Sequence, residues 1–243
     1  MTDLFDDYEE SPEISCTSAP FIRERKRNIS LHFNVFGVQS EMDTRMPNRL
    51  VLGYTRTMMG FLLFNPNPRH IGMIGLGGGS IQKYCHHYLP DTRISVAEVN
   101  AEVIGFRDCF HIPRDDHRFK VTCEDGADFV RRQQNQFDVL IVDGFDTAGQ
   151  PAQLCSQVFY DNCYMALTPE GILVVNVYEG RNSLLISRVR KSFQDRVVAV
   201  GGDDSDNAIV FAARGKVLGQ TNEQFTSNGQ SIERAAACQT WGN

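Results

Sequence analysis

Short segments of alternating apolar and polar residues, typical of strands, recur along this chain and are separated by segments with helical spacing. From residue 70 onward the strand-like segments are 71–74, 93–98, 119–123, 137–143, 171–178, 197–201 and 208–213. Apolar residues recur at helical spacing over 80–88, 101–110, 127–134, 153–167 and 183–193. This alternation predicts an α/β, doubly wound, mainly parallel sheet.

The last two strand-like segments, 197–201 and 208–213, are too close together for a helix to connect them. A short polar connection of this kind joins antiparallel strands. A mainly parallel Rossmann-like sheet with a C-terminal antiparallel strand is the layout of S-adenosylmethionine-dependent methyltransferases, and is less typical of nicotinamide enzymes. We therefore expect this fold class.

A chain of 243 residues with 42% hydrophobic composition can bury one good core. Residues 1–28 are first acidic and then basic, and predict a mobile tail. Residues 29–66 form a short lead-in, with a strand near 29–36 and helical spacing over 47–64. The cofactor-binding domain is expected over 67–215, followed by a polar tail over 216–243 with one short helix near 231–238.

Charge and cysteine content narrow the classes of partner. A net charge of −6 argues against a nucleic-acid partner. No apolar run is long enough to cross a bilayer and the N-terminal residues are acidic, so we expect a cytoplasmic protein without a membrane partner. The seven cysteines form no C-x-x-C pair and the six histidines lack zinc-like spacing, so we expect no metal. His86 and His87 are adjacent on a predicted helix and cannot face one another.

Glycines 75, 77, 78 and 79 follow the apolar strand 71–74. Glycine allows a tight turn into the next helix and a close approach of the backbone to a ligand. We therefore expect Gly75, Gly77, Gly78 and Gly79 to contact a cofactor. No Gly-Lys-Ser/Thr follows, which excludes a Walker-type phosphate loop. The alternative is a turn that only closes a βα unit.

Two further strand-like segments end in acids that suit a nucleoside. Glu98 lies 23 residues after Gly75, near the interval at which an acid binds a ribose, and its two oxygens match two hydroxyl donors. Asp125, followed by Gly126, precedes a helix. Asp125 can bind the exocyclic amine of adenine, cap the helix, or do both. The carboxyl ends of parallel strands meet at one edge, so these residues predict an adenosine-containing cofactor.

Asp143 and Asp146 follow the most apolar segment of the chain, 139–142. Burial disfavours the charged form of a carboxyl and raises its proton affinity, so Asp143 is the candidate catalytic base. Asp146 is expected either to cap the next helix or to hold a cationic substrate.

At these residues the chain resembles the polyamine aminopropyltransferases, the spermidine synthase family. The likeness covers roughly residues 39–213. It is carried by the glycine turn, by 97–100 and 124–127, and by 143–149 leading to Phe159 and Tyr160. The resemblance implies that Asp143 takes a proton from an attacking amine, that Asp146 anchors the substrate, and that Tyr54 lines its pocket.

The resemblance also implies the co-substrate, decarboxylated S-adenosylmethionine, whose aminopropyl group moves to a small-molecule amine. Three features depart from the family. Gly78 replaces an aspartate that grips the aminopropyl nitrogen, Thr55 and Arg56 stand where His or Gln and then Glu are usual, and the N-terminal region is short. The first two favour an alternative, a methyltransferase that uses intact S-adenosylmethionine. A non-catalytic nucleoside-binding homologue is a third reading. The oligomeric state stays open, with a homodimer as one option.

Overall fold

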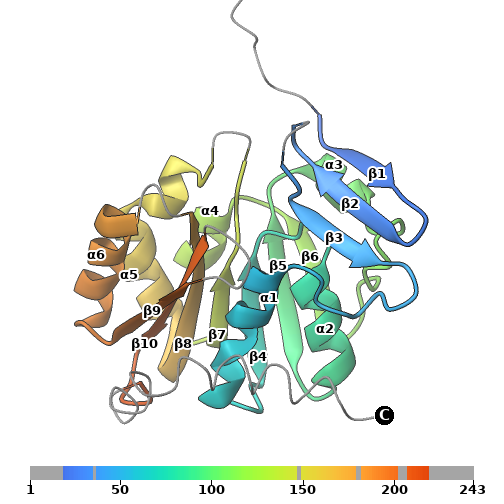
Figure 1. Ribbon diagram of the computed structural model, residues 1–243. Coiled ribbons are helices and arrows are strands. Elements are labelled where there is room, and N and C mark those ends of the chain that lie inside the picture. The colour runs from blue at the N-terminus through green and yellow to red at the C-terminus, as the bar shows by residue number, and fades with distance from the viewer. Residues whose placement is uncertain (1–18, 35–36, 147–148, 179–181, 202–206, 219–243) are drawn as a thin grey trace, which may run out of the picture.

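The computed structural model describes residues 19–34, 37–146, 149–178, 182–201 and 207–218. They form a three-stranded sheet, in the order β1-β2-β3, and a seven-stranded sheet, in the order β6-β5-β4-β7-β8-β10-β9. Figure 1 shows the small sheet beside one end of the large one, with helices on both faces of the large sheet. The expected segments near 231–238 and between the last two strands lie outside the described residues.

The strands are β1 (Phe21–Glu24), β2 (Asn28–His32), β3 (Ser40–Asp43), β4 (His70–Ile74), β5 (Arg93–Glu98), β6 (Phe119–Cys123), β7 (Phe137–Val142), β8 (Leu167–Tyr178), β9 (Val197–Gly201) and β10 (Asn207–Ala213). The helices are α1 (Gly53–Met58), η1 (Met59–Leu63), α2 (Ser80–Tyr88), α3 (Ala101–Gly105), α4 (Gly126–Arg131), η2 (Ala152–Cys155), α5 (Gln157–Ala166) and α6 (Asn182–Phe193). Several helices are shorter than the sequence pattern predicts, notably α1 and α3.

The large sheet has the predicted topology. Strands β6, β5, β4, β7 and β8 are parallel, and β10 is antiparallel to both β8 and β9. Ile74 at the end of β4 pairs with Ala97 of β5 and Val142 of β7. The residues after these positions therefore meet at one edge, which is where a doubly wound sheet binds its ligand. The predicted fold class is confirmed.

Two apolar clusters cover the two faces of the large sheet. One cluster contains Met58 and Phe61 of α1 and η1, together with side chains of α2 and of the small sheet. The other contains Phe129 of α4 and Phe193 of α6, with side chains of α5. Burial of this kind on both faces explains the nearly continuous apolar runs of β4, β7 and β8. Among the helices of the described residues, none is long and apolar enough to cross a membrane.

The N-terminal region differs from the expected boundary between a tail and a lead-in. Residues 21–24, assigned to the tail by composition, form β1 and pair antiparallel with β2. The backbones of Arg25 and Asn28 hydrogen-bond to each other across the turn. This hairpin turn contains Lys26 and Arg27 and none of the glycine or asparagine residues that usually mark such turns.

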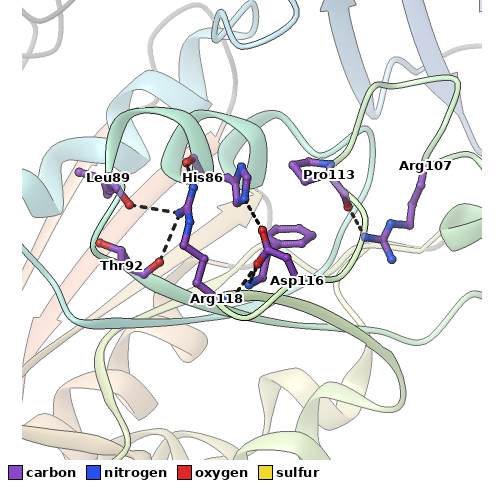
Figure 2. Close-up of polar contacts among 8 residues, drawn as sticks. His86, Leu89, Thr92, Arg107, Pro113, Asp116 and Arg118 are labelled. Carbon is purple, nitrogen blue, oxygen red and sulfur yellow. Dashed lines mark hydrogen bonds and ion pairs between the residues drawn. The ribbon is translucent and has the colours of Figure 1, made fainter.

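The end of α2 is closed by side chains that come from the segment before β6 (Figure 2). The Arg118 guanidinium donates to the carbonyls of His86, Leu89 and Thr92. Asp116 accepts a hydrogen bond from His86 Nε2 at 3.1 Å. The last carbonyls of a helix lack partners within it, so Arg118 supplies donors that the helix itself cannot.

Candidate functional site

A cavity of about 550 Å³ lies at the carboxyl edge of the large sheet. The turns after β4, β5, β6 and β7 line it, and residues of the small sheet, including Gln39 and Ser40, close one side. The predicted residues that line this cavity are Tyr54, Gly75, Gly77, Glu98, Asp125, Gly126, Asp143 and Asp146. Residues far apart in the sequence thus share one space large enough for a nucleoside.

Gly75 follows β4 and lies against the backbone of Asp143, which follows β7. Its φ is +94°, and a Cβ there would lie 2.2 Å from the carbonyl oxygen of Asp143. The N–H of Asp143 donates to the Ile74 carbonyl at 2.9 Å, and Gln82 Nε2 donates to the Gly75 carbonyl at 2.8 Å. Glycine is therefore required for the ends of β4 and β7 to approach each other, as well as for access to a ligand.

Gly78 and Gly79 do not belong to the described cavity lining. A Cβ at Gly78 would lie 2.8 Å from the Phe110 ring and from Ser40 Oγ. Gly79 has a φ of +66° and precedes α2, and a Cβ there would lie 2.4 Å from Ile112. Both glycines serve close packing behind the turn, so their expected contact with a cofactor has no support in the geometry.

Glu98 is held by backbone donors on both of its oxygens. Oε2 accepts from the Leu76 N–H at 2.9 Å, and Oε1 accepts from the Asn100 N–H at 2.8 Å. The residue is buried but lines the cavity. A carboxylate oxygen can accept more than one hydrogen bond, so both oxygens keep capacity for the two hydroxyls of a ribose.

Asp125 is the N-cap residue of α4, as one of its two predicted roles requires. Its Oδ1 accepts from the N–H groups of Ala127 and Asp128, at 2.7 and 3.3 Å. Its Oδ2 accepts from Gln153 Nε2 at 3.2 Å. The following Gly126 packs on Ile74, where a Cβ would lie 2.4 Å from Cγ2. The cap leaves Oδ2 as the oxygen that can bind an exocyclic amine, in competition with Gln153.

Asp143 is bound by two side chains, and neither belongs to a neighbouring turn. Asn176 Nδ2 donates to Oδ1 at 2.8 Å, and the Tyr54 hydroxyl donates to Oδ2 at 3.4 Å. Burial raises the pKa of Asp143, and these two hydrogen bonds oppose the rise. Burial and the adjacent Asp143 raise the pKa of Tyr54 well above its usual value, so its hydroxyl stays a donor. The shift at Asp143 has the direction expected of a base at a buried strand end.

Asp146 is exposed at the cavity edge, and its backbone forms an isolated bridge with Gly149. Arg56 lies outside the described cavity lining, because its guanidinium donates to the carbonyls of Leu50 and Val51. Arg56 therefore does not place a positive charge in the cavity. The described residues contain no cluster of His, Cys, Asp and Glu that could hold a metal ion.

Among the polar residues that the sequence did not predict, Asn176, Gln82 and Gln153 donate side-chain hydrogen bonds to predicted site residues. Asn176 carried a usable signal, because it interrupts the apolar run of β8 between Val175 and Val177. A polar side chain on a buried strand needs a hydrogen-bond partner. Near the carboxyl end of a parallel strand, where Asn176 lies, that partner can be a functional residue. The two glutamines lie in polar stretches where nothing distinguishes them.

Comparison with known proteins identifies the family. The profile of the spermine/spermidine synthase domain matches residues 51–198. A polyamine aminopropyltransferase from Chromobacterium violaceum is 37% identical over 209 residues, which cover 85% of this chain and 78% of that one. The chain belongs to the spermine/spermidine synthase family. The resemblance drawn from the glycine turn and the three acid motifs is thereby confirmed.

Solved structures agree with this membership at the level of the fold. A probable spermidine synthase from Corynebacterium glutamicum superposes with a TM-score of 0.69, at 20% identity, over 80% of this chain and 76% of that one. Human methyltransferase-like protein 13, in complex with SAH, gives a TM-score of 0.61 at 20% identity, over 76% of this chain and 89% of that one. Spermidine synthases and methyltransferases thus share this architecture, so the fold alone does not distinguish the two reactions.

Proposed function

We propose that this member of the spermine/spermidine synthase family is an aminopropyltransferase of polyamine biosynthesis. It moves the aminopropyl group of decarboxylated S-adenosylmethionine to an amine, with Asp143 as the base. The observation that carries the proposal is Asp143 itself, a partly buried carboxyl that follows β7 and whose pKa is raised by desolvation. It shares one cavity with Glu98 and Asp125.

The charge of the cavity favours a cationic co-substrate. Its described lining includes the carboxyl groups of Glu98, Asp125, Asp143 and Asp146 and contains no Lys, Arg or His. Decarboxylated S-adenosylmethionine carries a sulfonium and an ammonium group and no carboxylate, so it complements this lining. The carboxylate of intact S-adenosylmethionine would find no basic side chain there. Since Arg56 also points away, the methyltransferase alternative loses one of the two features that favoured it.

The residues present fit the adenosine part of the co-substrate. Glu98 would bind the ribose hydroxyls with the oxygen capacity that its two backbone bonds leave free. Asp125 Oδ2 would bind the exocyclic amine of adenine in place of Gln153. Gly75 and Gly77, which line the cavity, let the backbone lie close to the ligand.

The reaction needs a base because an alkyl amine, with a pKa near 10.4, is almost entirely protonated at neutral pH. Asp143 would take a proton from the acceptor amine, and Tyr54 would hold the carboxylate from the cavity side. The freed nitrogen attacks the propyl carbon bound to sulfur. A C–N bond forms, the C–S bond breaks, and the electron pair of that bond stays on sulfur in neutral methylthioadenosine. Asp146 would contact the acceptor at the cavity edge.

The test is release of methylthioadenosine from decarboxylated S-adenosylmethionine in the presence of a panel of diamines and polyamines. Intact S-adenosylmethionine is assayed in parallel for methyl transfer to the same amines. We expect product only from the decarboxylated form. Replacing Asp143→Asn should lower kcat roughly 100- to 10,000-fold, the usual contribution of a general base.

The matched control is Asp128→Asn, which replaces an exposed carboxyl of α4 that forms an ion pair with Arg131 and does not line the cavity. It should leave kcat unchanged. Undiminished turnover in Asp143→Asn would refute the assigned base. Methyl transfer without aminopropyl transfer would establish the methyltransferase alternative. Binding of methylthioadenosine without turnover of any amine would identify a non-catalytic homologue.

A further inference from the structure

Asn176 of β8 lies directly beside Asp143 because of the register between two parallel strands. Val142 of β7 pairs with Val175 of β8, so the next position on each strand brings Asp143 and Asn176 together. Asn176 is 2% exposed, and its Nδ2 donates to Asp143 Oδ1 at 2.8 Å. This is the shorter of the two side-chain hydrogen bonds that Asp143 accepts.

The other polar atom of the Asn176 amide, its carbonyl oxygen, is not hydrogen-bonded in the described part of the chain. This oxygen, Oδ1, is buried. A buried carbonyl without a partner destabilises a fold, and native proteins keep few of them. Its strand neighbours are apolar, since Asn176 pairs with Ile209 of β10 and Val174 lies on the same face of β8. Apart from Asp143, the strand neighbours of Asn176 are thus apolar, and the amide stands where this part of the sheet borders the cavity.

We propose that Asn176 is the positioning residue of Asp143. It fixes Oδ1 from the side of β8, so that Oδ2 faces Tyr54 and the cavity, and it keeps the partly buried carboxyl ionised. This inference rests on the proposed function, in which Asp143 must accept a proton. It also accounts for the unpaired Oδ1, because the fold keeps an amide among apolar strand neighbours.

The expected direction of the effect follows from the hydrogen bond. A donor to a charged carboxylate stabilises the ionised form, so its loss should raise the pKa of Asp143 further. Replacing Asn176→Leu removes the donor and the unpaired carbonyl together. Replacing Asn176→Asp keeps the shape and puts a second carboxyl against Asp143, which should raise the apparent pKa further.

The first measurement does not depend on turnover. Carboxyl ¹³C shifts of the protein labelled at aspartate are followed with pH, and the Asp143 signal is identified by its absence in Asp143→Asn. The second measurement is the pH dependence of methylthioadenosine release. Both the titration and the acid limb of kcat should move to higher pH in Asn176→Leu and further in Asn176→Asp. The matched control is Asn67→Leu, which replaces an exposed asparagine before β4 that does not line the cavity. It should leave both unchanged.

Stability separates positioning from a structural role. At pH 7 the unfolding midpoint of Asn176→Leu should lie below that of the parent, because the Asp143 carboxylate loses a donor, and at low pH, where Asp143 is protonated in both proteins, the difference should disappear. An unshifted Asp143 titration in folded Asn176→Leu would overturn the proposal, and so would a lower midpoint with an unshifted acid limb. If Asn176→Leu does not fold, the Asn176→Asp titration decides on the same criterion. An inactive parent protein would refute the proposed function separately, and the titration would still test Asn176.

Discussion

Replacing Gly75→Ala tests the claim that this glycine sets the distance between the turn after β4 and the catalytic end of β7. The added Cβ would lie 2.2 Å from the Asp143 carbonyl oxygen, whereas ordinary contacts begin near 3.4 Å. The Asp143 backbone must therefore retreat by about 1 Å, or the turn must open by the same amount. The φ of +94° adds a strain of roughly 1–3 kcal/mol for a residue with a side chain.

Two measurements follow from these values. The free energy of unfolding in urea should fall by about 2–4 kcal/mol, because the strain and part of the overlap persist after relaxation. A displacement of about 1 Å at the base should lower kcat roughly 100-fold, since the reaction depends on orientation at that scale. The affinity for methylthioadenosine should also fall, because Gly75 lines the cavity and precedes Leu76, whose N–H holds Glu98.

The matched control is Gly105→Ala at the end of α3, where a Cβ meets nothing within 4 Å. It should be neutral or slightly stabilising, since alanine is the better helix former. A Gly75→Ala protein as stable and active as the control would refute the steric argument. A large loss of stability with full kcat would show that the turn, and not Asp143, absorbs the overlap.

Two predictions concern how the free energy of unfolding depends on pH. Burial and Arg93 lower the pKa of His70 to about 4, so the folded state binds fewer protons than the unfolded state between pH 6.5 and 4. About 3 kcal/mol should be lost across this range in urea titrations, and the loss should vanish in His70→Gln but persist in the exposed-site control His117→Gln. Burial lowers the pKa of Lys83 to about 8. Stability should therefore rise by about 3 kcal/mol from pH 8 to 10.5. Lys83→Met should abolish this rise. A rise that persists in Lys83→Met would show that another group causes it.

The convergence of Glu98, Asp125 and Asp143 could be predicted from sequence because parallel strands impose it. Each acid follows a strand of one sheet, and the carboxyl ends of such strands share an edge. The antiparallel pairing of β9 and β10 was predictable for a similar reason, since their connection is too short for a helix. These conclusions need only the order of elements and the length of their connections.

Other features depend on contacts that the sequence does not encode locally. Gly78 looks like Gly77 in the sequence, but it packs against Phe110, which lies about 30 residues further along the chain. A glycine that approaches a ligand and one that approaches a side chain give the same pattern. The β1 strand was missed because its hairpin turn, Lys26 and Arg27, has the composition of a charged tail.

The carboxylates of the cavity are of two kinds, which differ in where their hydrogen-bond donors come from. Glu98 is held by backbone N–H groups, and Asp125 by those of its helix start, so any sequence that forms these turns supplies the donors. Asp143 is held by the side chains of Tyr54 and Asn176, which lie on other elements. Backbone donors fix a ligand-binding group whatever the neighbouring side chains are, whereas side-chain donors can be replaced one at a time. The proton affinity of the base is therefore the property of this site that single substitutions can most readily tune.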